Sequence, residues 1–141
     1  MGHTRFDGNG SSIKLNLVVS SIDLTSYTNV LVTLDTGACV TSIPTYIAGA
    51  LGYDLSNDCE ETEIVTGSGI ETVKVIEVKQ LTAIGESLND IKVWCCDLPF
   101  ESDVMGVLGY NFLEHFDINI SFSSNTIDIK RIKKKEKIWL P

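Results

Sequence analysis

The sequence predicts an all-β fold, a small barrel or sandwich, for a chain of 141 residues. About seven short segments alternate apolar with polar side chains, as half-buried strands do, whereas two short segments look helical. Apolar residues make up 43% of the chain and charged residues 21%, which is typical of a globular protein with a single core. These proportions argue against disorder, collagen and coiled coil.

The first strands are expected before residue 35. Apolar residues alternate over 13–19 and again over 30–34, and the second of these segments runs directly into Asp35. A further apolar segment ends at Pro44, which suits the first position of a helix. Gly52 would end that helix, because glycine adopts the left-handed backbone conformation that often follows a helix.

A hairpin is expected in the middle of the chain. Segments 61–65 and 70–80 are rich in Val, Ile, Thr and Glu, the composition of strands. Thr66-Gly67-Ser68-Gly69 separates them and would form a glycine-rich tip.

The remaining elements are expected near the C-terminus. A short helix is predicted over 110–115, with Gly109 or Asn111 as its cap. Alternation predicts three more strands, at 91–95, 118–122 and 127–131. The expected organisation is a flexible lead-in at 1–12, one domain at 13–130 and a basic tail at 131–141.

The net charge of −8 is unevenly distributed. Residues 1–129 hold 18 acidic and five basic side chains, whereas residues 130–141 hold six basic side chains and one acidic one. The acidic body would repel phosphate backbones, so we expect no nucleic-acid partner. The basic tail could contact an anionic surface, or it could be a solvated end that offsets the acidic body.

Several other classes of protein are not expected. No stretch approaches the ~20 consecutive apolar residues of a membrane span, and the N-terminus lacks the apolar region of a signal peptide. We therefore expect a soluble, cytoplasmic protein without a membrane partner. The four cysteines show no C-x-x-C spacing, so neither a metal nor another cofactor is predicted, and the thiols are expected to be reduced.

Asp35-Thr36-Gly37 is the strongest candidate for chemistry. A carboxylate at the end of a buried strand is unfavourable unless it is paired or hydrogen-bonded, so its position there indicates a specific role. Gly37 allows a tight turn and the close approach of a ligand, and Thr36 supplies a hydroxyl that can donate a hydrogen bond. The alternative is an aspartate that only stabilises a turn.

Two further segments make the pattern more specific, and together the sequence resembles the retropepsin-like aspartic proteases. These are single-domain relatives of retroviral proteases and of half a pepsin. Leu34-Asp35-Thr36-Gly37-Ala38, Thr66-Gly67-Ser68-Gly69-Ile70 and Val107-Leu108-Gly109 occur in the order of that family. Tyr110 follows Gly109 where viral enzymes usually have arginine, so the chain looks more like the cellular and bacterial members.

The resemblance implies a small closed acid-protease barrel, with one lobe per chain and one or two short helices. It also implies an aspartic endopeptidase acting on extended peptide or protein substrates. Asp35 would be catalytic, and since each chain holds one such motif, two chains would form a homodimer that shares the site. The resemblance gives the other site residues supporting roles: the catalytic loop Thr36, Gly37 and Ala38, the flap Thr66, Gly67, Ser68, Gly69 and Ile70, and the floor Val107, Leu108 and Gly109.

A second function remains open at this point. The same scaffold could be a catalytically inactive peptide-binding or dimerisation module, since a fold does not guarantee an activity. Replacing Asp35 by Asn separates the two, because an enzyme would lose turnover whereas a binding module would keep its affinity. The acidic body would also favour basic substrates.

Overall fold

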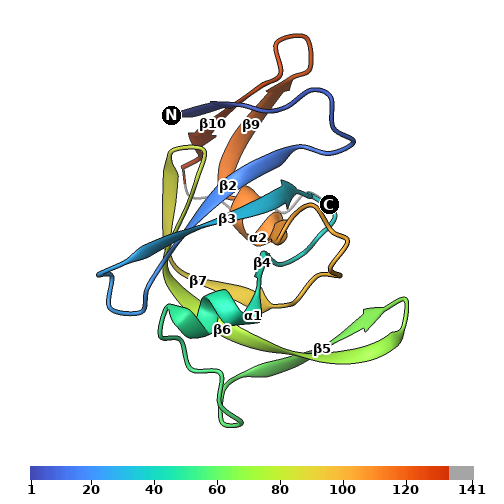
Figure 1. Ribbon diagram of the computed structural model, residues 1–141. Coiled ribbons are helices and arrows are strands. Elements are labelled where there is room, and N and C mark those ends of the chain that lie inside the picture. Colours follow the sequence, from blue (N-terminus) through green and yellow to red (C-terminus); the bar gives the residue numbers. More distant parts are fainter. Residues whose placement is uncertain (134–141) are drawn as a thin grey trace, which may run out of the picture.

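The computed structural model describes residues 1–133, which form ten strands and two short helices (Figure 1). Strands hold 50% of the described residues and helices 8%, so the predicted all-β class is confirmed. The basic tail expected at 131–141 lies outside the described residues from residue 134 onward. Within the described part, no helix is long and apolar enough to cross a membrane.

Six strands close into a barrel, which the resemblance implied. Each is hydrogen-bonded to the next, and β6 also pairs with β2, so that the ring has no open edge. The β3–β8 and β4–β7 pairs are parallel and the others are antiparallel. In order around the ring, the strands are β2 (Lys14–Ser20), β3 (Tyr27–Leu34), β8 (Gly106–Leu108), β4 (Ser42–Ile43), β7 (Glu86–Cys95) and β6 (Gly69–Ala83).

The barrel interior is filled by alternate residues of these strands. Leu17 and Val19 of β2 and Val30 and Val32 of β3 are fully buried, while the residues between them, Val18 and Leu31, are partly exposed. This confirms the alternation predicted for 13–19 and 30–34. Burying such side chains contributes roughly 1.5–3 kcal/mol each, so the inward rows hold the strands in register.

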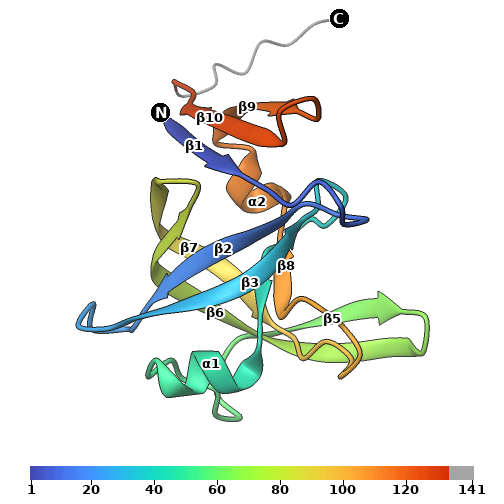
Figure 2. The ribbon, with the colours of Figure 1, turned by 45° about the horizontal axis from the view of Figure 1, so that its top comes forward.

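The predicted hairpin is present and extends beyond the barrel. β5 (Glu61–Thr66) lies at the edge of the sheet and pairs with the first part of β6, from Thr66 opposite Gly69 to Glu61 opposite Lys74. Both views show it as an arm that projects from the barrel wall (Figures 1 and 2).

The helices are close to their predicted positions, with a correction at the N-terminus of the first and at the C-terminus of the second, which ends at Leu113 and not at residue 115. α1 (Thr45–Ala50) begins one residue later than expected, so Pro44 is its N-cap instead of its first residue. Gly52 follows this helix with a φ of +89°, as a C-terminal glycine should. For α2 (Tyr110–Leu113) Gly109 is the N-cap, and Asn111 lies inside the helix.

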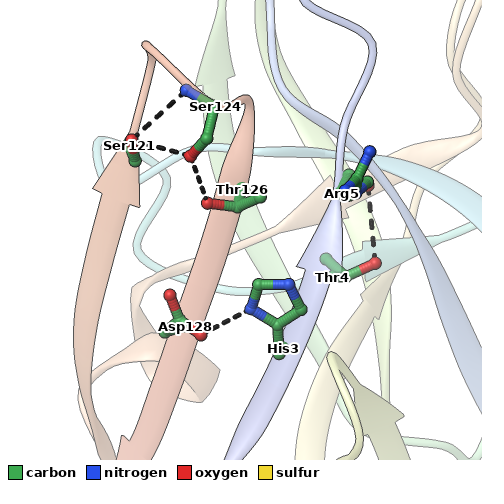
Figure 3. A network of polar contacts seen from close by, with 7 residues as sticks. All are labelled: His3, Thr4, Arg5, Ser121, Ser124, Thr126 and Asp128. Carbon is green, nitrogen blue, oxygen red and sulfur yellow. Dashed lines mark hydrogen bonds and ion pairs between the residues drawn. The ribbon is translucent and has the colours of Figure 1, made fainter.

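Part of the segment expected to be a flexible lead-in is a strand. β1 (Gly2–Arg5) pairs with β10 (Thr126–Arg131), which pairs with β9 (Phe116–Ser121) in a separate three-stranded sheet at the end of the barrel (Figure 2). Between β1 and β10, His3 Nδ1 lies 2.5 Å from Asp128 Oδ1 (Figure 3). A side chain at Gly2 would overlap the carbonyl of Ile84, so glycine allows β1 to pack against the barrel.

The β7 strand is longer than the alternation over 91–95 predicted. It begins at Glu86, directly after a two-residue turn formed by Ile84 and Gly85, whose φ angles are 52° and 76°. Such turns are usually made by Asn-Gly or Asp-Gly, so Ile84-Gly85 gives a weak signal in the sequence.

Candidate functional site

Asp35 lies at the point where β3 leaves the barrel. Its backbone N–H donates to the Leu108 carbonyl at 3.0 Å, which extends the parallel pairing of β3 and β8 by one residue. The chain then turns, with the Ala38 N–H donating to the Asp35 carbonyl at 3.2 Å and the Gly37 N–H donating to Asp35 Oδ1 at 2.8 Å. The side chain is therefore held by its own loop, and Asp35, Thr36 and Gly37 are all exposed.

A second loop packs directly against the first. The Tyr110 N–H donates to the Ala38 carbonyl at 2.7 Å, where β8 passes into α2. A Cβ atom at Gly109 would lie 2.7 Å from the carbonyl carbon of Val40 and 2.9 Å from the Ala38 oxygen. Since both are backbone atoms, only glycine allows this approach without movement of the Asp35 loop.

A buried polar network joins these two loops to the barrel wall. Asn111 Oδ1 accepts hydrogen bonds from both the N–H and the hydroxyl of Thr41, each at 2.9 Å. The Thr41 hydroxyl oxygen in turn accepts the Gly109 N–H at 3.0 Å, and Asn111 Nδ2 donates to the Lys92 carbonyl at 2.7 Å. Thr41 is fully buried, so its hydrogen bonds with Asn111 and Gly109 lie where the dielectric is low and such bonds are strong.

Thr41 and Asn111 were not predicted as part of the site from the sequence. The two residues are 70 positions apart, and neither carries a charge or a motif of its own. The available signal was Asn111 beside Gly109, which we interpreted only as a possible helix cap.

The tip of the hairpin is a two-residue turn. Gly67 and Ser68 lie between the paired residues Thr66 and Gly69, and Gly69 has a φ of +112° that favours glycine. The Thr66 hydroxyl donates to the Gly69 carbonyl and accepts the Ser68 N–H, both at 3.2 Å. Ile70, which follows the tip, is 70% exposed, so the tip offers apolar surface outside the barrel.

A groove of about 780 Å³ separates the hairpin from the barrel. One wall comes from the Asp35 loop, β4 and β8, the second from the hairpin, and the third from the end of β7 and the segment after it. The main lining residues, wall by wall, are Ala38, Val40, Ser42 and Val107; Ile64, Thr66, Ser68, Glu71 and Val73; and Trp94, Cys96, Asp97, Leu98 and Pro99.

The predicted site residues lie around this groove in two groups. Ala38, Thr66, Ser68 and Val107 line the groove itself. The others lie beside it: Asp35, Thr36 and Gly37 are exposed on the adjoining loop, Gly67, Gly69 and Ile70 form the exposed tip, and Leu108 and Gly109 are buried behind the floor. Val107 alternates with two buried neighbours, so it faces the groove while Leu108 anchors the strand in the core.

The thiols at the third wall are poor nucleophiles. Burial raises the pKa of Cys95 to about 12, and the nearby Cys96, Cys59 and Asp97 add to that shift. Burial, followed by the charge of Asp97, also raises the pKa of Cys96. Thiols react as thiolates, so the groove presents neutral sulfhydryl groups near neutral pH. Among residues 1–133, no three His, Cys, Asp or Glu side chains group together as ligands for a metal ion would.

Comparisons with known proteins bear on this arrangement. A family model described as "gag-polyprotein putative aspartyl protease" matches residues 25–115, more than half of the chain, including Asp35, the hairpin and Gly109. The crystal structure of a retropepsin-like aspartic protease from Rickettsia conorii is similar, with a TM-score of 0.63 and 21% sequence identity over 89% of this chain and 86% of that chain. At that identity the likeness shows a shared fold. No curated protein matches the chain.

Proposed function

Since the chain belongs to the family of gag-polyprotein aspartyl proteases, we propose that it is an endopeptidase in which two copies each supply one Asp35. One observation carries the proposal. Asp35 is exposed on a hydrogen-bonded loop beside a groove whose other wall is the hairpin. The carboxylate is thus accessible to a second chain and close to the space that a peptide would occupy.

The dimer follows from the number of carboxylates. Peptide hydrolysis of this type needs two, and the chain holds one Asp-Thr-Gly motif. In an isologous dimer the two-fold axis would pass between the Asp35 loops, so that each loop contacts its own copy. Thr36, exposed beside Asp35, would donate its hydroxyl to the equivalent loop of the partner.

The proposed chemistry uses one proton shared by the two carboxyl groups. Two carboxylates at hydrogen-bonding distance cannot both ionise easily, so one stays protonated. The ionised group takes a proton from water as the water oxygen attacks the peptide carbonyl carbon, and the protonated group donates to the carbonyl oxygen. Breaking the C–N bond then requires a proton on the leaving nitrogen, which the dyad supplies.

The substrate would lie extended between the hairpin and the floor. Backbone groups at the tip, around Gly67 and Ser68, are exposed and are able to pair with an extended peptide. Closure of the hairpin would exclude water and bring the peptide onto Ala38 and Val107. Action in the cytoplasm stays a prediction from the sequence.

The test is Asp35→Asn, with cleavage of a mixed library of unstructured peptides as the assay. The variant should lose at least about a thousandfold in kcat, because an amide can neither accept the proton from water nor share one with its partner. Its oligomeric state, measured by sedimentation, should stay unchanged. Equal cleavage by both proteins would overturn the proposal, whereas binding without cleavage by either would indicate an inactive peptide-binding module.

A further inference from the structure

We propose that the groove selects peptides with a lysine or arginine side chain, whose cationic group lies between the carboxylates of Glu71 and Asp97. This inference rests on the proposed function, since it assigns a substrate class to the same groove. The hairpin carries one of the two carboxylates, and the opposite wall of the groove carries the other.

Glu71 lies on the groove side of the hairpin. In the β5–β6 register Glu71 is opposite Ile64, and residues two apart share a face of the sheet. The groove face therefore holds Ile64 and Thr66 of β5 and Glu71 and Val73 of β6, all of which line the groove. Glu63, one residue from Ile64, belongs to the opposite face. A carboxylate among Ile, Val and Thr side chains gives this face its charge.

Asp97 comes from the opposite wall, two residues after β7 ends. Its Oδ1 accepts the Thr45 N–H at 2.9 Å, which fixes the carboxylate at the beginning of α1. Both Asp97 and Thr45 line the groove. The position of this second charge is thus set by the fold, and a peptide in the groove would pass between Asp97 and the hairpin.

The two charges act on the same part of the groove. Cys96 lies beside Asp97, and its pKa is raised first by burial and then by the charges of Asp97 and Glu71. Glu71, Cys96 and Asp97 all line the same groove, so both carboxylates border the space that a peptide side chain would enter. Trp94 in β7 lies two residues before Cys96. It also lines the groove and offers an aromatic surface to a cation.

One basic side chain also lines the groove, but it does not cancel the charge of both carboxylates. Among the described lining residues the one lysine is Lys74, and its Nζ donates to the carbonyls of Leu55 and Ser56. Its single positive charge offsets at most one of the two carboxylates that line the groove, Glu71 and Asp97. Within residues 1–133, neither Glu71 nor Asp97 forms an ion pair with a basic side chain. The groove consequently keeps an excess of negative charge for a ligand to neutralise.

Peptide binding tests the inference without relying on catalysis. The probes are fluorescent octapeptides in which a single lysine is moved along the sequence, each matched by a peptide with norleucine at the same position. Affinities are measured by anisotropy with the full chain carrying Asp35→Asn, so that no peptide is cleaved. At one position, lysine should bind about tenfold more tightly than norleucine at low ionic strength.

Two charge-neutralising variants in this background provide the comparison. Glu71→Gln should reduce the lysine advantage to about twofold or less, whereas Glu63→Gln, on the opposite face of the same hairpin, should preserve it. Equal affinity for lysine and norleucine at every position, absence of binding, or an advantage that survives Glu71→Gln would each overturn the inference. A lysine preference in binding, with no cleavage by the unmodified chain, would overturn the proposed endopeptidase and leave this inference standing.

Discussion

Gly109 and Thr41 decide where the Asp35 loop lies. Gly109 leaves room for the backbone of Ala38 and Val40, and Thr41 hydrogen-bonds both to the Gly109 N–H and to Asn111. Neither residue is exposed. The position of an exposed carboxylate thus depends on two buried neighbours, and substitutions there should act on stability and on the site together.

Gly109→Ala should destabilise the fold. The new Cβ would lie within 3 Å of three backbone atoms, which must move apart, and overpacking of this kind lowers the free energy of unfolding by about 1–3 kcal/mol. Urea denaturation measures the change. Gly67→Ala is the matched control, because a Cβ there meets no atom within 4 Å, and its stability should remain close to that of the unmodified chain. Equal losses in both variants would refute the packing explanation.

Thr41→Val keeps the shape of the side chain and removes its hydroxyl. The Gly109 N–H then loses its acceptor and Asn111 Oδ1 loses one of its two Thr41 donors, so the free energy of unfolding should fall by about 1–3 kcal/mol. A double-mutant cycle with Asn111→Ala measures the coupling. If the two losses are simply additive, the network is not a unit.

At the level of single residues, the sequence marks the candidate carboxylate more clearly than the residues that support it. Asp35 carries a signal in its neighbours, because an acid directly after an apolar strand is an unusual placement. Thr41 and Asn111 are ordinary polar residues in the sequence, and their role depends on being brought together across 70 positions. The proposed role of Glu71 likewise depends on the face of the hairpin on which it lies, which the sequence alone does not give.

At the level of elements, periodicity predicted the strands that have long apolar rows. β2, β3 and the β5–β6 hairpin were found where alternation places them. β4 has two residues and β8 has three, and each is a strand because of its neighbours, with Ser42 paired to both Trp94 and Val107. β1 is likewise a strand because it pairs with β10. Such pairings are tertiary contacts, which local patterns do not contain.

The turn between β2 and β3 makes the stability depend on pH. Asp23 accepts hydrogen bonds from the Ser21 hydroxyl at 2.7 Å and from the Thr25 hydroxyl and N–H, and these bonds lower its pKa from 3.8 to about 2. The folded chain therefore binds fewer protons there than the unfolded chain. The stabilisation is present above about pH 4 and is lost as the pH falls towards 2.

Asp23→Asn isolates this contribution, because the amide oxygen can still accept hydrogen bonds but cannot titrate. The melting temperature of the unmodified chain should exceed that of the variant at pH 6 and converge towards it near pH 2. Thermal unfolding followed by circular dichroism at a series of pH values measures the difference. A difference that is the same at pH 6 and pH 2 would contradict the assigned role of the carboxylate.

At the level of the whole molecule, the proposed activity belongs to a pair of chains. The barrel is closed, but the candidate site is half of what the chemistry needs, because each chain has one Asp35. The net charge of −8 on each chain opposes association through long-range repulsion, so the dimer should be tighter at higher ionic strength.

Dilution tests whether the site is shared. As the protein concentration falls below the dimer dissociation constant, the activity per chain should fall in proportion to the dimer fraction. The measurement is a series of initial rates over at least three decades of concentration, with sedimentation as the parallel record of the oligomer. Constant activity per chain in a range where the protein is monomeric would show that one chain suffices.

The most direct measurement is the distance between the two Asp35 carboxyl groups in an experimental structure of the dimer. The account predicts that their nearest oxygens lie about 2.5–3.2 Å apart, the range in which one proton can be shared. A dimer that leaves the two carboxyl groups well separated and open to solvent, in a preparation that cleaves peptides, would contradict it.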